Sequence, residues 1–338
     1  MESMTATMPI ESTAQGSRER TATIALLVAT LFWGSGFTWA KSGGEAVNRL
    51  LELPNGSAAG PVWLLAFRFV LAGALWMVIF PASRRGWTWR GAGRTAVAGL
   101  LLASGLVTQH LGLDRASEAV TAFLTSLTIL FVPLLMTLFL RRPPPGILWA
   151  GVGLATVGVW MMTGASPGGF GVGEALGLAC AVLFSLHIIA INIVVTRDDP
   201  ARVAPGQFFT VGVVCAVTCL FVERGPEALL PGRSIELALH ADARWNLLLM
   251  IVLVTICAFG LQTHFQPRID PTRAALLYLV EPIFAAAYAW IFAGRGLAAI
   301  AAAGAGLILA ANVMVEMIQS RRRSRPLMDA GQGPAIVD

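Results

Sequence analysis

The chain has 338 residues, of which 56% are hydrophobic and only 13% are charged, and its mean hydropathy is +0.71. A soluble domain of this size cannot bury so much apolar surface, so the composition excludes a soluble globular protein and predicts a membrane protein throughout. The net charge of +5 comes almost entirely from arginines spread between apolar runs, which argues against a nucleic-acid-binding patch.

The chain reads as a series of membrane spans between two polar tails. Residues 1–21, rich in Ser, Thr and Met, are expected to form a disordered cytoplasmic tail, and residues 318–338 a basic and then polar cytoplasmic tail. Between them lie ten apolar runs of spanning length. These runs are expected near residues 22–41, 61–81, 95–113, 117–140, 146–164, 173–195, 205–222, 246–265, 271–293 and 297–317.

Arginines between the runs predict the orientation. If the amino terminus is inside, the inside segments include Arg84–Arg85, Arg141–Arg142 and the basic cluster at 321–325, whereas the outside segments carry fewer, isolated basic residues. Positive residues concentrate on the cytoplasmic side of membrane proteins. We therefore expect a multi-pass protein of the inner (plasma) membrane with both termini in the cytoplasm.

Two halves of five spans each predict an inverted repeat, because an odd number of crossings turns the second copy upside down. The apolar stretch 119–133 ends in a proline, as does 271–282. Each is followed by a run of small residues, 151–158 and 303–310, which are expected to pack closely as scaffold. The predicted fold class is thus an all-α membrane protein whose ten transmembrane helices form two inverted five-helix repeats, 22–164 and 173–317.

The ninth predicted span carries an unusual charge. Asp270 and Pro271 are typical of a helix start, which places Glu281 near the middle of a ~30 Å hydrocarbon slab. Pro282 removes a backbone donor and predicts a kink there, as Pro133 does in the fourth span. A carboxylate at this depth is tolerated only where it faces protein or a wet cavity.

Arg68 is a second charge expected at membrane depth, and we expect it to pair with Glu281. Two interpretations of the pair stay open. It could be a permanent ion pair that only fixes helix packing. Alternatively, Arg68 could meet a substrate carboxylate while Glu281 exchanges a proton or holds an ammonium group.

Uncharged polar side chains add candidates for a binding site. The amides of Gln109 and Gln262 have donors and acceptors that one backbone carbonyl cannot satisfy, whereas a lone Ser or Thr usually bonds its own helix. The full set of predicted substrate-binding residues is Trp33, Ser35, Arg68, Gln109, Gln262, Tyr278 and Glu281.

Two long outside loops, 42–60 and 223–245, have two interpretations as well. They are either tolerated surface insertions or a lid over an outward-facing cavity. Within the first loop, residues 45–53 could form a short interfacial helix.

Several chemistries lack a sequence signature. The chain has no Gly-x-x-x-x-Gly-Lys loop for ATP, and no His-Glu-x-x-His or paired cysteine spacing for a metal. The four cysteines lie within predicted spans and are interpreted as small core residues. We therefore expect no cofactor and no metal, and any transport to be secondary or facilitated, with coupling to a proton or another ion as an option.

Particular segments resemble the EamA-type permeases of the drug/metabolite transporter superfamily: Trp33-Gly-Ser-Gly-Phe-Thr-Trp-Ala-Lys41, Arg68-Phe69, residues 123–135, Gln262 and residues 271–285. The likeness runs from about residue 22 to 317, and the 271–285 motif is its most specific part. It implies ten helices, a central cavity open alternately to each side, and export of amino acids or related small solutes.

The sequence departs from that family at two places. Relatives often carry Gly-Glu just after the fourth and ninth spans, where this chain has Arg141 and Arg295. We expect altered gating or packing at the membrane rim. The resulting hypothesis is a secondary transporter that exports small metabolites by alternating access. The alternatives are a non-transporting membrane scaffold or relic and, less favoured, an integral-membrane lipid-modifying enzyme, which would need acids, histidines or a serine triad gathered at one interface.

Overall fold

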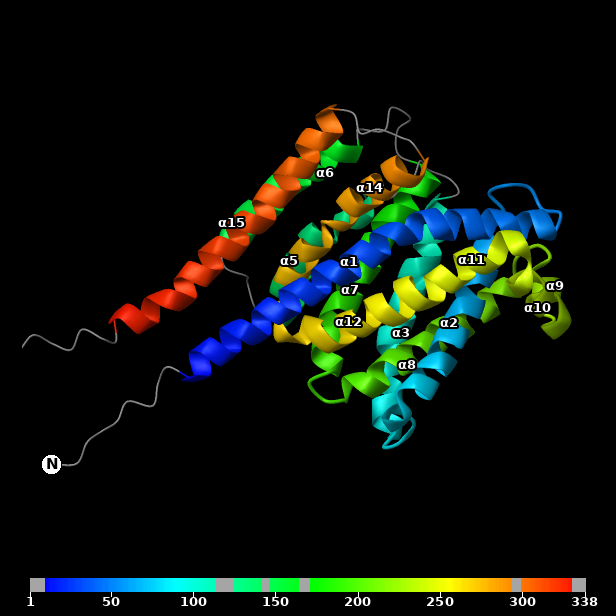
Figure 1. The fold of residues 1–338 in the computed structure, drawn as a ribbon, viewed down its shortest axis with the longest axis horizontal. Helices are drawn as coiled ribbons and strands as arrows, with labels where there is room; N and C mark the ends of the chain where they lie inside the picture. The colour runs from blue at the N-terminus through cyan, green and yellow to red at the C-terminus, as the bar shows by residue number, and fades with distance from the viewer. Residues whose placement is uncertain (1–9, 114–123, 142–145, 164–170, 294–298, 330–338) are drawn as a thin grey trace, which may run out of the picture.

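A computed structural model of the protein describes residues 10–113, 124–141, 146–163, 171–293 and 299–329, and every regular element in these ranges is a helix (Figure 1). The α-helices are α1 (Ile10–Leu50), α2 (Ala59–Ile79), α3 (Trp89–Leu113), α5 (Thr128–Leu140), α6 (Gly146–Thr163), α7 (Val172–Val194), α8 (Pro200–Cys219), α9 (Gly225–Ala228), α10 (Pro231–Leu239), α11 (Ala241–Leu249), α12 (Ala258–Phe265), α13 (Pro271–Tyr278), α14 (Glu281–Ala293) and α15 (Ala299–Asp329). Three other helical segments join them: 3₁₀ turns η1 (Pro81–Arg84) and η3 (Gln266–Arg268), and the π-helix η2 (Met250–Cys257).

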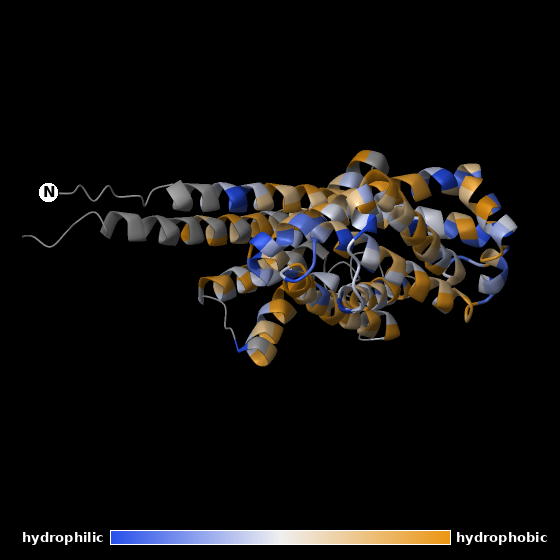
Figure 2. Cartoon of the chain, turned by 90° about the horizontal axis from the view of Figure 1, so that it is seen from below, coloured by the Kyte–Doolittle hydropathy of each residue, from blue (hydrophilic) through white to orange (hydrophobic). Residues whose placement is uncertain are grey.

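The helices have the length and surface of membrane spans. In the described ranges, 6 helices are long and apolar enough to cross a bilayer, and shorter apolar helices lie at 124–139, 146–158 and 302–315. Hydrophobic residues run along the helices, as Figure 2 shows, and many large ones are exposed: Leu138, Phe139 and Ile291 are each about two-thirds exposed. Such a surface is stable in lipid rather than in water. The all-helical, multi-pass membrane fold predicted from the sequence is confirmed.

Helices in matching places of the two halves run in opposite directions. Near the end of α2, the Trp76 indole donates to the Ala201 carbonyl at the start of α8 (3.0 Å), whereas Gly212, later in α8, lies against Val70, earlier in α2. The helices α6 and α15 are antiparallel in the same way. The second half is therefore inverted relative to the first.

Several contacts between helices recur between the corresponding helices when the two halves are interchanged. Helix α3 packs against α7 as α1 packs against α12, and α5 packs against α7 as α1 packs against α14. The pairs α2–α8, α5–α13 and α6–α15 join each helix to its own counterpart. This is the pattern that a two-fold relation between halves produces, and it supports the duplication predicted from the two proline helices.

The predicted scaffold helices α6 and α15 pack tightly together, and Figure 1 shows them set to one side of the other helices. A Cβ atom on Gly158 would lie 2.7 Å from the Gly304 carbonyl oxygen, so a larger residue there would push the helices apart. Small residues permit close approach in lipid, where the hydrophobic effect does not drive helices together.

Helix α1 is longer than predicted at both ends. It begins at Ile10, within the expected disordered tail, and continues to Leu50, so no separate interfacial helix forms at 45–53. Val47 is fully buried, and the Asn48 side chain fixes the following turn by donating to Ser57 O (2.8 Å) and accepting from Gly60 N (2.7 Å). Burial of this segment against the bundle stabilises the extra turns despite two glycines. At the other end of the chain, α15 runs to Asp329, into the predicted tail.

The two long loops bind one another at the end of the bundle away from the termini. Arg224 donates to the Leu51 carbonyl and Arg233 to the Leu50 carbonyl, while the Trp63 indole donates to Ser234 Oγ (3.1 Å). These contacts hold the short helices α9 and α10 on the ends of α1 and α2. The segment is a packed cap, and none of its described residues lines the cavity described below.

The ninth span is broken rather than kinked. The sequence predicts one helix over 271–293, but α13 ends at Tyr278, Leu279 and Val280 form a turn, and α14 starts at Glu281. Pro282 thus occupies the first turn of α14, where its missing N–H costs nothing. Pro133 lies inside α5, and that helix is preceded by a turn at Leu127. Where the sequence predicts a kink at Pro282, the structure has a turn between two separate helices.

Candidate functional site

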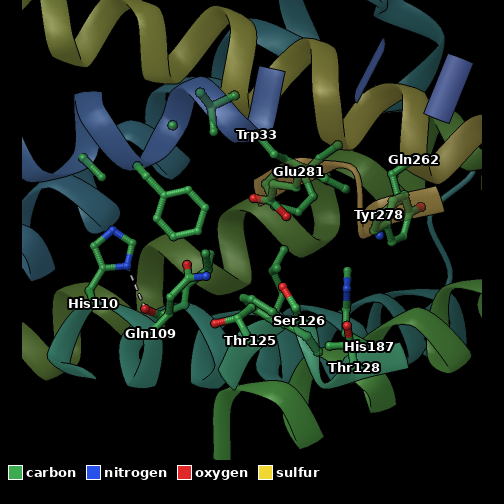
Figure 3. Close-up of a pocket in the computed structure, with 18 of the residues that line it drawn as sticks. Trp33, Gln109, His110, Thr125, Ser126, Thr128, His187, Gln262, Tyr278 and Glu281 are labelled. Atoms are coloured by element: carbon green, nitrogen blue, oxygen red, sulfur yellow. Dashed lines mark hydrogen bonds between the residues drawn. The ribbon is translucent and has the colours of Figure 1, made fainter. Parts of the chain in front are cut away.

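A cavity lies at the centre of the bundle, between the two halves (Figure 3). The cavity volume that the centres of water-sized molecules can occupy is about 120 Å³. This is enough for several waters or a small solute. Its walls come from α1, α2, α3, the start of α5 and the segment before it, α7, η2, α12, α13 and α14. The lining residues are Trp33, Gly36, Phe37, Ala40, Arg68, Leu102, Leu106, Gln109, His110, Thr125, Ser126, Thr128, Phe184, His187, Ile188, Met250, Val254, Phe259, Gln262, Tyr278, Leu279, Glu281 and Pro282.

The structure brings together six of the seven residues predicted from the sequence to bind substrate. Trp33, Arg68, Gln109, Gln262, Tyr278 and Glu281 all line this cavity. Ser35 does not: it is buried, and its hydroxyl donates to the Phe32 carbonyl of its own helix (2.6 Å). Sharing a cavity does not test substrate binding, which stays a prediction for these six.

Both broken helices begin at the cavity. Thr128, the first residue of α5, and Glu281, the first residue of α14, face the same space from opposite halves of the chain. The first N–H groups of a helix lack intrahelical partners and carry partial positive charge, which favours a carboxylate at the position of Glu281. Figure 3 shows the Glu281 carboxylate pointing into the cavity, above Thr125 and Ser126.

Close packing of α1 fixes the position of Glu281. A Cβ atom on Gly34 would lie 2.7 Å from Phe284 Cβ and 3.1 Å from the Glu281 carbonyl oxygen. Glycine is therefore needed for the two helices to approach this closely. The neighbouring Trp33 ring packs against Phe259 (5.1 Å) and Tyr278 (5.2 Å) and forms an aromatic wall.

Arg68 is almost fully buried, with 1% of its surface exposed. Its Nη1 donates to the Met250 thioether (3.4 Å), and its guanidinium lies 4.7 Å from the centre of the Phe69 ring. Among the described residues, no ion pair joins Arg68 to Glu281, so the predicted pair is wrong. Equal depth in the membrane does not determine direction around the helix axes, and the two side chains enter the cavity at separate places.

Buried hydrogen bonds close the cavity on the side of the chain termini. Gln266 is their centre: its Oε1 accepts from Gln262 Nε2 and from the Tyr278 hydroxyl, each at 2.9 Å. Its Nε2 donates to the Ile188 carbonyl (2.7 Å) and to Asn192 Oδ1. This network links α7, α12 and α13 below the cavity.

An ion pair continues this closure toward the termini. Arg273 Nη1 donates to Glu19 Oε2 (3.1 Å), and Arg273 Nη2 donates to Thr23 Oγ1 (3.2 Å), which connects α13 with α1. Asn192 Nδ2 donates to the Ile269 carbonyl (3.0 Å) beside them. On this side the Arg273 contacts with α1, which can exchange for water, thus join the two halves.

Sequence reasoning missed much of the lining. His110 and His187 line the cavity, and His187 hydrogen-bonds Gln207 (3.0 Å), but the sequence indicates both only as polar residues of their spans. Phe37, Phe259 and Met250 have no signal at all, since an apolar residue of a span can face lipid, another helix or a cavity. The π-helical stretch η2 has no signature either, and it directs Met250 and Val254 into the cavity.

Within the described ranges, no group of three or more His, Cys, Asp or Glu side chains is placed to hold a metal ion. The site is instead a mixed polar and aromatic chamber with one acid and one guanidinium. Its chemistry suits binding rather than bond cleavage.

The sequence profile of the EamA-like transporter family matches the chain twice, over residues 20–164 and 171–317. The chain belongs to the EamA-like transporter family. The two matches correspond to two EamA domains and confirm both the resemblance to the drug/metabolite transporter superfamily and the internal repeat. This is a family of transporters and not of enzymes.

One curated protein and one solved structure are similar to this EamA-family protein along most of its length. A curated relative from Archaeoglobus fulgidus, described as an uncharacterized transporter, is 24% identical over 309 residues, which cover 90% of this chain and 88% of the relative. A solved crystal structure superposes with a TM-score of 0.68 at 19% identity, covering 89% of this chain and 98% of that one. At this identity the likeness shows a shared fold.

Arg141 and Arg295 stand where the resemblance leads one to expect acids, and the structure describes only Arg141. Arg141 caps α5 with left-handed backbone (φ 50°), and its N–H donates to the Met136 carbonyl. Its side chain is exposed, in agreement with a position at the rim rather than in the cavity. Arg295 lies outside the described residues.

Proposed function

We propose that this EamA-family protein is a secondary transporter that exports small polar or amphipathic metabolites, such as amino acids or related solutes, by alternating access. The observation that carries the proposal is the central cavity, where a carboxylate, a guanidinium, two amides and an aromatic wall converge from both halves of an inverted repeat. Binding sites of secondary transporters lie at the repeat interface, near helix breaks at the membrane midplane.

The geometry of the closure supports alternating access. On the terminal side, Arg273 of the second half bonds Glu19 and Thr23 of α1 in the first half, while the Gln266 network ties together α7, α12 and α13 within the second half. On α1 the lining residues run from Trp33 to Ala40, away from that end, so this conformation has its closed side at the termini. Rocking of the halves about the breaks at Val280 and Leu127 would break the Arg273 contacts with α1 and open the cavity on the side of the termini.

The distribution of arginines between the spans predicts the orientation of the protein in its membrane. We propose the inner membrane with both termini in the cytoplasm, so that the closed side of this conformation is the cytoplasmic one. Figure 1 shows the start of α1 and the end of α15 at the same end of the molecule. A green fluorescent protein fused to residue 338 should fluoresce in cells, while an alkaline phosphatase fused there should be inactive.

Export is tested by comparing metabolites in the medium of cells that overexpress the wild type, Glu281→Gln or an empty vector. We expect one class of small solute to accumulate with the wild type and not with Glu281→Gln, because the substitution removes the only carboxylate of the described cavity lining. Equal profiles for the wild type and the empty vector would favour a non-transporting scaffold.

A further inference from the structure

Buried polar atoms that lack a hydrogen-bond partner cluster around the cavity. Six buried side-chain nitrogen or oxygen atoms of the described residues lack a hydrogen-bond partner within the protein, and four of them belong to the cavity lining. These four are Trp33 Nε1, Arg68 Nε, His110 Nε2 and Gln262 Oε1. Buried polar groups of native proteins are almost always hydrogen-bonded, so a cluster of unpaired ones marks a place where something else binds.

Arg68 is the most demanding of the four, because its charge is permanent. In the described structure its only hydrogen bond goes to the Met250 thioether, which is a weak acceptor, and no carboxylate lies within ion-pair distance. A buried cation without a counter-ion is strongly disfavoured, and intramembrane charges without a structural partner mark ligand pathways. The planar guanidinium is suited to bind an oxyanion with two parallel hydrogen bonds.

We infer that Arg68 is the anion subsite of this transporter, and that the transported solute carries a carboxylate which binds the Arg68 guanidinium. The inference rests on the proposed function and gives its substrate class. Arg68 is the one arginine or lysine in the described lining, which gives a single place for a carboxylate, so the class is a monocarboxylate. The aromatic wall of Trp33 and Phe259 provides space for an apolar side group.

A panel of matched solutes tests the carboxylate on the wild type alone. L-Phenylalanine and 3-phenylpropionate carry the group, whereas L-phenylalaninol and 2-phenylethylamine have the same ring without it; leucine, 4-methylpentanoate, leucinol and 3-methylbutylamine form an aliphatic set. Each solute is added at millimolar concentration to the purified protein in detergent, and thermal unfolding is followed. We expect carboxylates of at least one set to raise the unfolding temperature and their partners to leave it unchanged.

Substitutions at Arg68 assign the effect to the residue. Arg68→Met should fold, since it removes an unpaired buried charge and leaves no polar group behind. The apparent affinity for the protecting carboxylate should fall about 10- to 100-fold, as expected for loss of a charge-assisted hydrogen bond. Arg68→Lys keeps the charge and should retain part of the preference. Arg244→Met, an exposed arginine outside the cavity, is the matched control.

Each other outcome overturns the inference. Protection by the amines or alcohols equal to that by the carboxylates would remove the need for an anion subsite. Unchanged carboxylate affinity in Arg68→Met would place the subsite elsewhere, and no protection by any carboxylate would exclude this substrate class. The metabolite comparison described above is separate: if export is detected while the carboxylate panel fails, the proposed function stands and only the anion subsite is lost.

Discussion

Arg273 of α13 donates to the Glu19 carboxylate of α1 across the boundary between the two halves, and both side chains are buried (Nη1–Oε2 3.1 Å). Glu19→Gln removes the carboxylate charge that the buried Arg273 binds, so the free energy of unfolding should fall by about 3 kcal/mol. The same cost is expected for Arg273→Gln. Denaturation in mixed micelles measures both.

Access of a reagent to the cavity from the closed side gives a second measurement of what this ion pair does. In a cysteine-free background, the thiol of Ile188→Cys should react faster with an impermeant reagent from the terminal side when Glu19→Gln is present. Glu52→Gln is the control, because its contact with Arg224 is exposed and contributes little. Unchanged reactivity in Glu19→Gln would show that the ion pair does not hold the cavity closed.

Gln266 should contribute more to stability than any single partner of its network. Gln266→Leu leaves the Ile188 carbonyl, Asn192 and the Tyr278 hydroxyl without the bonds they make now, at about 1–3 kcal/mol for each group that stays buried and unpaired. Tyr278→Phe removes one hydrogen bond and should cost about 1 kcal/mol. Equal losses for the two variants in thermal unfolding would argue against Gln266 as the centre of the network.

Gly34→Ala should displace α14 from α1. The added Cβ would lie 2.7 Å from Phe284 Cβ and 3.0 Å from the Ala285 backbone nitrogen, and such overpacking costs about 1–3 kcal/mol. Gly153→Ala is a matched control, since a Cβ atom there would meet nothing within 4 Å and alanine favours the helix. Export by Gly34→Ala should decrease together with stability, whereas Gly153→Ala should lose neither.

Asp198, between α7 and α8, should make stability depend on acid pH. Arg94 donates to both of its oxygens (2.6 and 2.8 Å), and this contact lowers the pKa of the Asp198 carboxyl below its usual 3.8. A carboxyl with a depressed pKa stabilises the fold fully above its unfolded value, and the contribution disappears as the pH falls through the folded value. Stability should therefore be flat near neutrality and decrease below about pH 4.

The variant Asp198→Asn isolates this effect. The difference in unfolding free energy between the wild type and Asp198→Asn should be constant from neutral pH to about pH 4 and shrink at lower pH. Arg94→Gln should abolish the same acid-dependent difference. A gap between the wild type and Asp198→Asn that widens toward acid would contradict the assigned direction.

The class of this protein, its duplication and part of its polar site follow from the order of its residues. Long apolar runs have no stable place outside a bilayer, an odd number of spans inverts a repeated half, and charges or amides at membrane depth need polar surroundings. For these reasons Arg68, Gln109, Gln262, Tyr278 and Glu281 can be identified without coordinates, and all of them line the cavity.

Which of these groups meet depends on how the helices pack in three dimensions. Depth along a helix follows from residue number, but direction around the axis depends on neighbours, so Arg68 and Glu281 share a cavity without forming the expected pair, and Ser35 turns to its own helix. The break at Val280, the Glu19–Arg273 contact and the lining by Phe259 likewise depend on packing between distant segments. Local sequence contains no information about which distant segment will lie beside it.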